Sequence, residues 1–600
     1  MRNLLPRPSL LVVLLLLLFL GAVVAGLASG WRHEIPPPNA SDPTGEPWFA
    51  DITQEADLNF VHDAGPVGKY FMPQSIGSGA AVFDFTADGG VKYLYLLHNG
   101  GPQGKKNQLF ERQPGRRFRD VSAGSRLDIA GYNMGVAVGD VNNDGRPDIL
   151  VTQYTGVKLF LNNGDGAFTD VTEEAGLSNP AWGVSAAFFD YDRDGWLDLI
   201  LVNYVDYDPT WACPSPSGAP EYCGPRTFPG QVSKLFHNLG TARKGKGRGV
   251  RFEDVTIGAG LAAAPGPGLG VVCADFDGDG WPDIFVANDG QANRLWRNQH
   301  DGTFREEAIK RGVAFNGLGT VQAGMGVALG DVDGDGLLDL YITHMPQEGN
   351  TLWRQAPRGL FVDHTTAAGL ATLSWRGTGF GTVLADFDHD GGLDIAAVNG
   401  RIARAPTLGN PDLGPYWGRY ADRNQLFAND GKGRFREVSS QNPALSGTAN
   451  VARGLVCADF DGDGAPDLLV TAIADRVRLL RNVAPHRGHW LVVRTLDPAL
   501  KRDAYGALVR VRAGGREWVR LVNPAGSYLC SGDVRAHFGL GEAERVEAVE
   551  VTWPDATVEV FPGCSADRQL VLYRGAGKRV AGEGEHVPGS PASSKGGAAP

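Results

Sequence analysis

The chain contains little cysteine, with 6 among its 600 residues. So few cysteines exclude a disulfide-rich scaffold, and none of them has the Cys-x-x-Cys spacing of a zinc site. Cys213 and Cys223 lie close together in a turn-rich stretch, where we predict a disulfide in an oxidising compartment. Cys273 and Cys457 each stand two residues before an Asp-rich loop, where a small buried hydrophobic side chain belongs, so we expect both to be free.

Positive charge is also scarce, because 56 lysines and arginines stand against 68 aspartates and glutamates, a formal net charge of −12. Nucleic-acid binding depends on clustered positive charge, so this balance excludes nucleic acid as the main partner and favours cations. Hydrophobic residues make up 42% of the chain, which excludes a wholly disordered protein. A chain of 600 residues is too long for one hydrophobic core, so we expect several domains or one large repeat structure.

The amino terminus has the composition of an export segment. Arg2 and Arg7 precede an uncharged run over residues 10–28 that is mostly leucine and valine, and small residues follow it. We predict that residues 1–30 are either a cleaved signal peptide or a retained membrane anchor, because the run approaches the ~20 residues of a membrane span. Both alternatives place the body outside the cytoplasm, as a secreted, periplasmic or cell-surface protein. Residues 31–47 contain three consecutive prolines and are predicted to be an extended linker.

An acidic motif recurs along the body of the chain. The pattern Asp-x-(Asp/Asn)-x-Asp-Gly-x-x-Asp occurs six times, and a degenerate version starts at Asp84. The full copies start at Asp140, Asp190, Asp275, Asp331, Asp386 and Asp459. The underlying period is about 53 residues once the insertions at residues 204–231 and 401–423 are set aside, which indicates one structural unit per copy.

A second motif, Leu-(Phe/Trp)-x-Asn followed by Phe-x-Asp-Val-Thr, indicates how the repeat array closes. The copy at residues 479–482 lacks its second half, and residues 49–53 form that half alone. A closed ring explains this split, because the first strand can complete the last sheet. Short strand-like runs flank each acidic loop, and sustained helical periodicity is lacking. We therefore predict an all-β fold, a seven-bladed β-propeller with calcium-binding loops over residues 48–483.

The acidic loops have the ligand pattern of calcium sites. Oxygen-bearing side chains at positions 1, 3 and 5, a glycine at 6, a main-chain carbonyl at 7 and a carboxylate at 9 match the way that loops wrap Ca²⁺, and we expect position 9 to use both oxygens. The helix-loop-helix motif is excluded, because its glutamate at position 12 is missing here. The predicted ligands are Asp140, Asn142, Asp144, Arg146 and Asp148; Asp190, Asp192, Asp194, Trp196 and Asp198; Asp275, Asp277, Asp279, Trp281 and Asp283; Asp331, Asp333, Asp335, Leu337 and Asp339; Asp386, Asp388, Asp390, Gly392 and Asp394; and Asp459, Asp461, Asp463, Ala465 and Asp467.

The first loop departs from this pattern. Asp84 and Asp88 are present, but Thr86 is a poor ligand at position 3 and Lys92 replaces the closing carboxylate. The sequence predicts about six calcium ions in the full loops. It leaves open whether the first loop binds a weak seventh ion or none.

These repeats resemble the FG-GAP or VCBS repeats of integrin alpha-chain propellers. Residues 489–574, with Gly526-Ser527-Tyr528-Leu529 and His537-Phe538-Gly539-Leu540-Gly541, resemble the ASPIC/UnbV domain. The whole layout is similar to the family of cartilage acidic protein and its bacterial relatives. The resemblance implies calcium binding and an extracellular or cell-surface setting, and it carries no general catalytic activity.

The terminal region also alternates in the manner of strands, so residues 489–574 are predicted to form a β-sandwich or a small barrel. Whether Cys530 pairs with Cys564 is left open. His537 has no nucleophile beside it in the sequence, so we interpret it as a structural histidine. Residues 575–600 are predicted to be a disordered tail.

Two functions from different classes fit the sequence. The first is a calcium-stabilised binding or adhesion module for an extracellular protein or a glycan, because the metal loops are not accompanied by a catalytic constellation that we can name. The alternative is an enzyme acting on polysaccharides or small metabolites, of the lyase or dehydratase type, with its pocket at a mouth of the ring. Trp182, Trp211, Trp375 and Trp417 lie near predicted loops, where they could stack on sugars or pack in the core.

Overall fold

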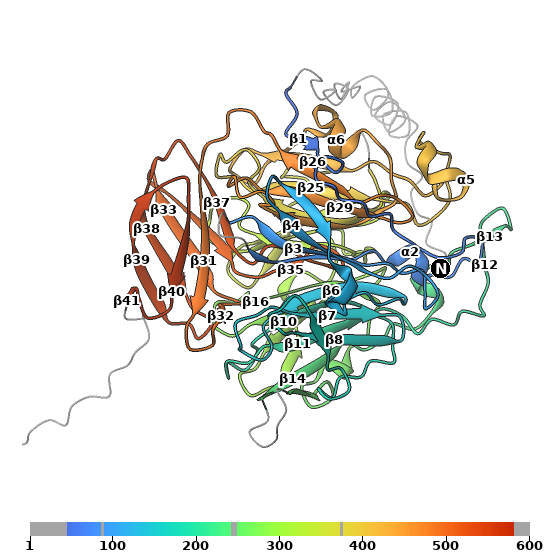
Figure 1. Ribbon diagram of the computed structural model, residues 1–600, viewed down its shortest axis with the longest axis horizontal. Coiled ribbons are helices and arrows are strands. Elements are labelled where there is room, and N and C mark those ends of the chain that lie inside the picture. Colours follow the sequence, from blue (N-terminus) through green and yellow to red (C-terminus); the bar gives the residue numbers. More distant parts are fainter. Residues whose placement is uncertain (1–44, 86–88, 242–248, 372–375, 581–600) are drawn as a thin grey trace, which may run out of the picture.

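The structure is a computed structural model, and it describes residues 45–85, 89–241, 249–371 and 376–580. The fold is all-β, as predicted, and seven antiparallel sheets of the described chain have a four-stranded unit (Figure 1). From inner to outer strand these units are β2 (Ala80–Phe85), β3 (Val91–Leu96), β4 (Gln108–Gln113) and β5 (Arg117–Asp120); β6 (Asn133–Gly139), β7 (Asp148–Gln153), β8 (Gly156–Asn162) and β9 (Phe168–Asp170); β10 (Gly183–Phe189), β11 (Asp198–Asn203), β14 (Lys234–Thr241) and β15 (Val250–Asp254); β16 (Gly268–Ala274), β17 (Asp283–Asn288), β18 (Arg294–Asn298) and β19 (Phe304–Glu306); β20 (Val327–Gly330), β21 (Asp339–Ile342), β22 (Thr351–Gln355) and β23 (Phe361–Asp363); β24 (Gly379–Ala385), β25 (Asp394–Asn399), β26 (Gln425–Asn429) and β27 (Phe435–Glu437); and β28 (Ala452–Ala458), β29 (Asp467–Ala472), β30 (Arg478–Asn482) and β1 (Phe49–Asp51).

The sheets form a ring around a shared axis. Their inner strands contact one another in the cyclic order β2, β6, β10, β16, β20, β24, β28 and back to β2. Several of these strands, such as β6, β10 and β16, are buried along their whole length, because each lies between two neighbouring sheets and the axis. The outer strands are short, which limits the exposed hydrogen-bonding edges at the rim.

The N-terminal strand completes the last sheet, as the split repeat predicts. β1 pairs antiparallel with β30, with Phe49 opposite Asn482 and Asp51 opposite Leu480. The backbone N–H of Val483 donates to the carbonyl of Trp48, and the Phe49 ring packs edge-on against Phe387 at 5.1 Å. Two segments more than 400 residues apart in the chain therefore close the ring.

The short helices lie in the connections. They are α2 (Pro73–Ile76), α3 (Ser122–Ser125), α4 (Ala308–Arg311), α5 (Gly414–Trp417) and α6 (Pro443–Ser446), with 3₁₀ turns at Pro225–Thr227, Leu261–Ala263, Pro411–Leu413 and Ser439–Gln441. A small hairpin, β12 (Cys213–Pro214) with β13 (Pro220–Glu221), lies in the first insertion.

The C-terminal domain is a sandwich of two sheets that share one hydrophobic core, and it lies beside the ring (Figure 1). This resolves the choice between sandwich and barrel. Its strands are β31 (His489–Asp497), β32 (Arg502–Asp503), β37 (Ala536–Gly541) and β40 (Arg568–Tyr573) in one sheet, and β33 (Leu508–Ala513), β34 (Arg516–Leu521), β38 (Arg545–Thr552), β39 (Val558–Ser565) and β41 (Lys578–Val580) in the other.

One loop of this domain enters the axis of the ring. We call residues 523–533 the axial loop; it contains β35 (Ala525–Gly526) and β36 (Cys530–Ser531). β36 pairs in parallel with β2, the Val136 N–H donates to the Leu529 carbonyl, and Ser527 exchanges two backbone hydrogen bonds with Val327. Tyr528 is fully buried, and its ring lies 5.1 Å from that of Phe380 on β24. The axial loop thus fills the channel that seven inner strands surround.

We expect Tyr528→Ala to destabilise the ring and not only the C-terminal domain. Replacing a fully buried aromatic side chain by alanine typically reduces the free energy of unfolding by ~3–5 kcal/mol. The matched control is Tyr573→Ala, because Tyr573 is 49% exposed on β40. Equal melting temperatures for the two variants would show that the axial loop is not part of the ring's core.

The other mouth of the ring is covered by α2 and by the two insertions. The Ile76 carbonyl of α2 accepts a hydrogen bond from the Tyr528 hydroxyl. The insertions meet above this mouth: Arg404 forms a 2.9 Å ion pair with Glu221, whose carboxylate also accepts a 2.6 Å hydrogen bond from Tyr420. Both mouths are therefore occupied by side chains of the described chain.

The remaining sequence predictions have mixed outcomes. The Cys213–Cys223 disulfide is present, with a Cα–Cα distance of 5.2 Å, and Cys273, Cys457, Cys530 and Cys564 are free. The predicted start of the tail at residue 575 is wrong, because residues 578–580 form β41 and pair with β39. The predicted export segment lies outside the described residues, and in the described part of the chain no helix is long and apolar enough to cross a membrane.

Candidate metal centres

The six acidic loops follow the inner strands and face the C-terminal domain. Each connects an inner strand to the second strand of its sheet, as from β6 to β7. Arg502 of the C-terminal domain donates to the Asn143 side chain in the Asp140 loop and to the Gly195 carbonyl in the Asp190 loop. On the opposite side, Arg516 donates to the Asp390 carbonyl. The C-terminal domain therefore packs directly on the loops.

The backbone of these loops is held in one shape. Positions 4 and 6 have positive φ in every full loop, as at Asn143 (54°) and Gly145 (91°), which is why glycine is placed at position 6. The carboxylate of position 1 accepts the N–H of position 6, at 2.7 Å from Gly145 to Asp140. The same bond recurs in the other five loops.

The position-9 carboxylate fastens each loop to its sheet. One oxygen of Asp148 accepts the N–H of Val141 at 3.0 Å, and the other accepts the N–H of Asn162 on the third strand at 2.9 Å. Asp198, Asp283, Asp339, Asp394 and Asp467 repeat this arrangement. The two oxygens that we expect to close a metal shell thus also hold the loop together.

The loop oxygens converge as a cation site requires. Within each of four loops, three carboxylates have oxygens within 4.8 Å of one another; these sets are Asp190, Asp192 and Asp194, Asp275, Asp277 and Asp279, Asp331, Asp333 and Asp339, and Asp386, Asp388 and Asp394. The Oδ1 atoms of Asp190, Asp277 and Asp386 are buried and lack a hydrogen-bond partner in the described chain. Hard oxygen donors that are buried together without partners fit a hard divalent cation.

Burial perturbs these carboxyl groups strongly in the metal-free protein. It raises the pKa of Asp386 to about 8, with repulsion from Asp390 and Asp388 as the next causes, and it raises that of Asp459 to about 7. Burial likewise raises the pKa of Asp283 and of Asp339 to about 8. Ionised carboxylates are therefore costly in these loops until a cation compensates them.

A pH dependence of the metal-free protein follows. An unfolded aspartate titrates near ~3.9, so between about pH 4 and pH 8 the folded loops bind more protons than the unfolded chain. Folded stability in chelator should therefore fall as pH rises through this window, and the melting temperature should be higher at pH 6 than at pH 8. The sequence predicts calcium in these loops, and a bound cation competes with protons for the carboxylates, so the melting-temperature gain on adding calcium should be larger at pH 8. A gain that is larger at pH 6 would contradict this assignment.

Cationic side chains already neutralise part of the charge in most loops. Arg297 on β18 lies 2.5 Å from Asp277 and 2.7 Å from Asp279 through their Oδ2 atoms, and Arg481 on β30 pairs with Asp461 and Asp463 at 2.9 Å. Arg354 pairs with Asp333 and Asp335 in the same way. In each case the guanidinium lies against the Oδ2 atoms of the position-3 and position-5 carboxylates.

The first loop carries its own cation. The Lys92 ammonium, at the position of the missing carboxylate, lies 3.0 Å from Oδ2 of Asp84. Thr86 and Asp88 lie outside the described residues. Lys92 neutralises the charge of Asp84 without a metal ion. The first loop therefore has less uncompensated negative charge to attract a cation than the six full loops have.

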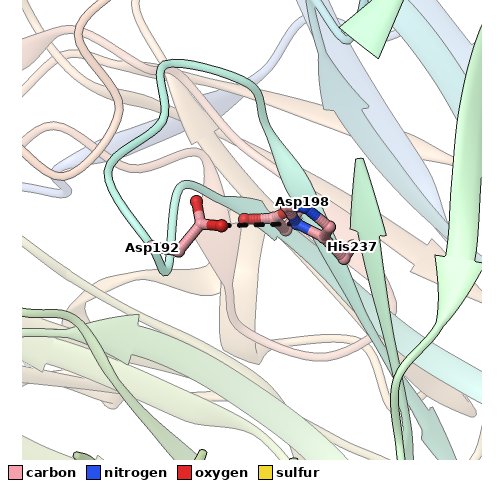
Figure 2. Close-up of side chains that lie close together, drawn as sticks. All are labelled: Asp192, Asp198 and His237. Atoms are coloured by element: carbon pink, nitrogen blue, oxygen red, sulfur yellow. Dashed lines mark hydrogen bonds and ion pairs between the residues drawn. The ribbon is translucent and has the colours of Figure 1, made fainter. Parts of the chain in front are cut away.

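A histidine joins the Asp190 loop, and the sequence analysis missed it. Figure 2 shows His237 of β14 beside Asp192 and Asp198, with Nδ1 at 3.0 Å from Asp198 Oδ1 and 3.5 Å from Asp192 Oδ2. The hydrogen bond with Asp198 raises the pKa of His237 to about 9. The signal was present, because His237 occupies the variable position of the Leu-Phe-x-Asn motif, where three other repeats have arginine.

The tryptophans that could stack on sugars differ in their exposure to solvent. Trp182 and Trp417 are buried, whereas Trp211 is 60% exposed on the first insertion. Trp375 lies outside the described residues. Nε2 of His537 donates a hydrogen bond to the Gly464 carbonyl at 2.9 Å, and burial lowers the pKa of His537, which fits its interpretation as a structural histidine.

Comparison with known proteins matches these repeats and the terminal domain. A family model described as the FG-GAP-like repeat matches residues 84–151, 140–201, 275–342, 331–397 and 409–470, which together make up half of the chain. A second model, described as ASPIC and UnbV, matches residues 497–579.

Two relatives align over most of their length. Cartilage acidic protein 1 of Homo sapiens is 27% identical over 571 residues, 88% of this chain and 77% of the relative. The Mus musculus protein of the same name is 26% identical over 516 residues, 73% of each chain. Among solved structures, an Agrocybe aegerita lectin described as recognising non-reducing terminal N-acetylglucosamine overlaps 68% of this chain and 92% of its own, with 15% identity and a TM-score of 0.39.

Proposed function

Because the chain belongs to the family of FG-GAP-like repeat proteins and ends in an ASPIC and UnbV domain, we propose that it is an extracytoplasmic calcium-binding β-propeller that acts as a binding or adhesion module. The observation that carries the proposal is the recurrence of one loop geometry six times, together with buried carboxylate oxygens that lack hydrogen-bond partners at Asp190, Asp277 and Asp386. Calcium takes six to eight such oxygens at 2.3–2.6 Å, with mixed carboxylate and carbonyl ligands. In this proposal the position-7 residues, such as Arg146 and Trp196, supply carbonyls.

The location outside the cytoplasm is supported by the disulfide in the first insertion. Cys213 and Cys223 lie in a stretch with little regular structure, and such a bond persists in oxidising compartments. The predicted export segment agrees with this location.

The face opposite the C-terminal domain is the better candidate for ligand binding. The loop face is covered by that domain, whereas the opposite face presents the two joined insertions (Figure 1). Trp211 is exposed there, beside the disulfide, and the neighbouring Asp208 is also exposed. An exposed tryptophan on a stapled loop is a suitable anchor for a protein or a sugar ring.

No comparable feature of the described residues favours the enzymatic alternative. It requires a pocket at a mouth of the ring, and in the described chain α2 and the axial loop occupy the axis. A cavity of about 210 Å³ lies between the C-terminal domain and inner strands, but it is lined by Arg520 and Asp386, which belong to the domain contact.

The test is a screen of extracellular proteins and glycans with the full-length protein in calcium and in chelator, with product analysis of each glycan. We expect calcium-dependent binding without turnover, and loss of binding in Trp211→Ala. Trp211→Phe is the matched control, because it retains an aromatic face. Product formation from a glycan would overturn the proposal in favour of the enzyme.

A further inference from the structure

The Asp190 loop has a histidine, His237, on the third strand of its sheet. The residue before the recurring Asn or Gln of the third strand is Leu161, His237, Arg297, Arg354, Ala428 and Arg481 in chain order. His237 and the three arginines contact carboxylates of their loops. The strand register makes these positions equivalent. The residue before each of them pairs with the second residue of the second strand, as Phe236 pairs with Leu199 and Trp296 with Ile284.

The chemistry of these side chains is not equivalent. A guanidinium has only donors, so Arg297, Arg354 and Arg481 can neutralise carboxylates but cannot bind a metal. A neutral imidazole has a lone pair, so His237 can do either. The Asp190 loop is the one full loop with a histidine at this third-strand position. The histidine beside the Asp275 loop, His300, lies in the turn after β18, with Nε2 2.8 Å from Asp279 Oδ2.

The geometry of the loop places this nitrogen among oxygens. His237 Nδ1 lies 3.0 Å from Asp198 Oδ1 and 3.5 Å from Asp192 Oδ2, and the three ligand atoms lie within 4.8 Å of one another. Ligands that share an ion at about 2.0–2.2 Å are separated by distances of this order. Figure 2 shows the three side chains converging from the loop, β11 and β14.

An independent observation in the same loop concerns an oxygen of Asp190. Asp190 Oδ1 is buried and has no hydrogen-bond partner in the described chain, and the Asp190 side chain belongs to a residue that is only 8% exposed. The set of Asp190, Asp192 and Asp194 shares Asp192 with the set that includes His237. One ion could therefore draw on both sets.

We propose that the Asp190 loop is a mixed nitrogen–oxygen site that prefers a transition-metal ion of the zinc type over calcium. The inference rests on the proposed function in one respect, namely that the full loops bind divalent cations. Imidazole with two or three carboxylates is a ligand set for zinc, whereas a ligand set of oxygens alone suits calcium. His237 thus sets the metal preference of one sheet within an otherwise calcium-binding ring.

The test exchanges the third-strand residues of two loops in the full-length protein. Wild-type, His237→Arg and Arg297→His proteins are stripped of metal, loaded with micromolar Zn²⁺ in millimolar Ca²⁺ and desalted, and both metals are counted in the same samples. We expect one zinc in the wild type, loss of that zinc in His237→Arg with a ~10-fold or greater fall in zinc affinity, and a second zinc in Arg297→His.

The outcomes separate this inference from the proposed function. Calcium without zinc in the wild type, or zinc that His237→Arg still retains, overturns the inference and leaves calcium binding intact. Absence of both metals overturns the proposed function as well. If His237→Arg fails to fold, the gain of zinc in Arg297→His remains decisive, because no gain there shows that the imidazole position does not select zinc.

Discussion

Deletion of residues 31–55 behind an intact export segment should give a protein that aggregates or melts far below the full chain. The deletion removes β1, which completes the seventh sheet against β30. It also removes Trp48 and Phe49, which are 8% and 2% exposed, and the loss of each buried aromatic typically reduces the free energy of unfolding by ~3–5 kcal/mol. The uncovered edge of β30 would then be free to pair with other chains. Thermal melting and light scattering measure both effects.

Deletion of residues 581–600 is the matched control, because the described fold ends with β41 at Val580. A point variant refines the test: Phe49→Ala should lower the melting temperature, whereas Ile257→Ala should not, since Ile257 is 84% exposed. A shortened protein as stable as the parent would show that the ring does not depend on its N-terminal strand.

The repeats and the ring closure could be predicted because they depend on local chemistry. Each loop needs aspartates at alternate positions and a glycine at positive φ, and these requirements are visible wherever the loop occurs. Residues 49–53 supply the half of the second motif that the copy at residues 479–482 lacks. β1 accordingly pairs with β30. The repeat period therefore predicted the long-range pairing of β1 with β30 as well as the local shape of the loops.

The axial loop could not be predicted, because nothing in residues 523–533 distinguishes a buried hairpin from an exposed one. Its burial depends on seven inner strands from distant repeats that leave a channel of matching size. The bridge between Glu221 and Arg404 has the same origin: two insertions nearly 200 residues apart meet only once the ring is closed. His237 could be predicted only in part. The sequence shows its position in the motif, but it does not show that its side chain lies close to Asp198.

Removal of divalent cations should have the largest effect of all. Each site that binds only the folded protein stabilises it by ~2.7 kcal/mol at a free calcium concentration 100 times its dissociation constant, and the proposed function has six such sites. Without calcium the buried carboxylates face one another, because burial and mutual repulsion raise the pKa of Asp386 and of Asp388 to about 8 and about 6. We therefore expect a large fall in melting temperature in chelator, reversed by calcium.

The loss of stability in chelator should differ from loop to loop. The Asp386 loop has Ala428 where three other sheets have arginine, and within the described residues none of its carboxylates forms a salt bridge. The Asp275 loop has Arg297 and Arg311 beside Asp277. Hydrogen exchange in chelator should therefore open residues 386–394 before residues 275–283, and metal analysis should find about six ions per chain in calcium. Two or fewer ions would mean that calcium does not hold the ring together. Equal opening of the two loops would mean that Arg297 and Arg311 do not compensate the Asp275 loop for the missing calcium.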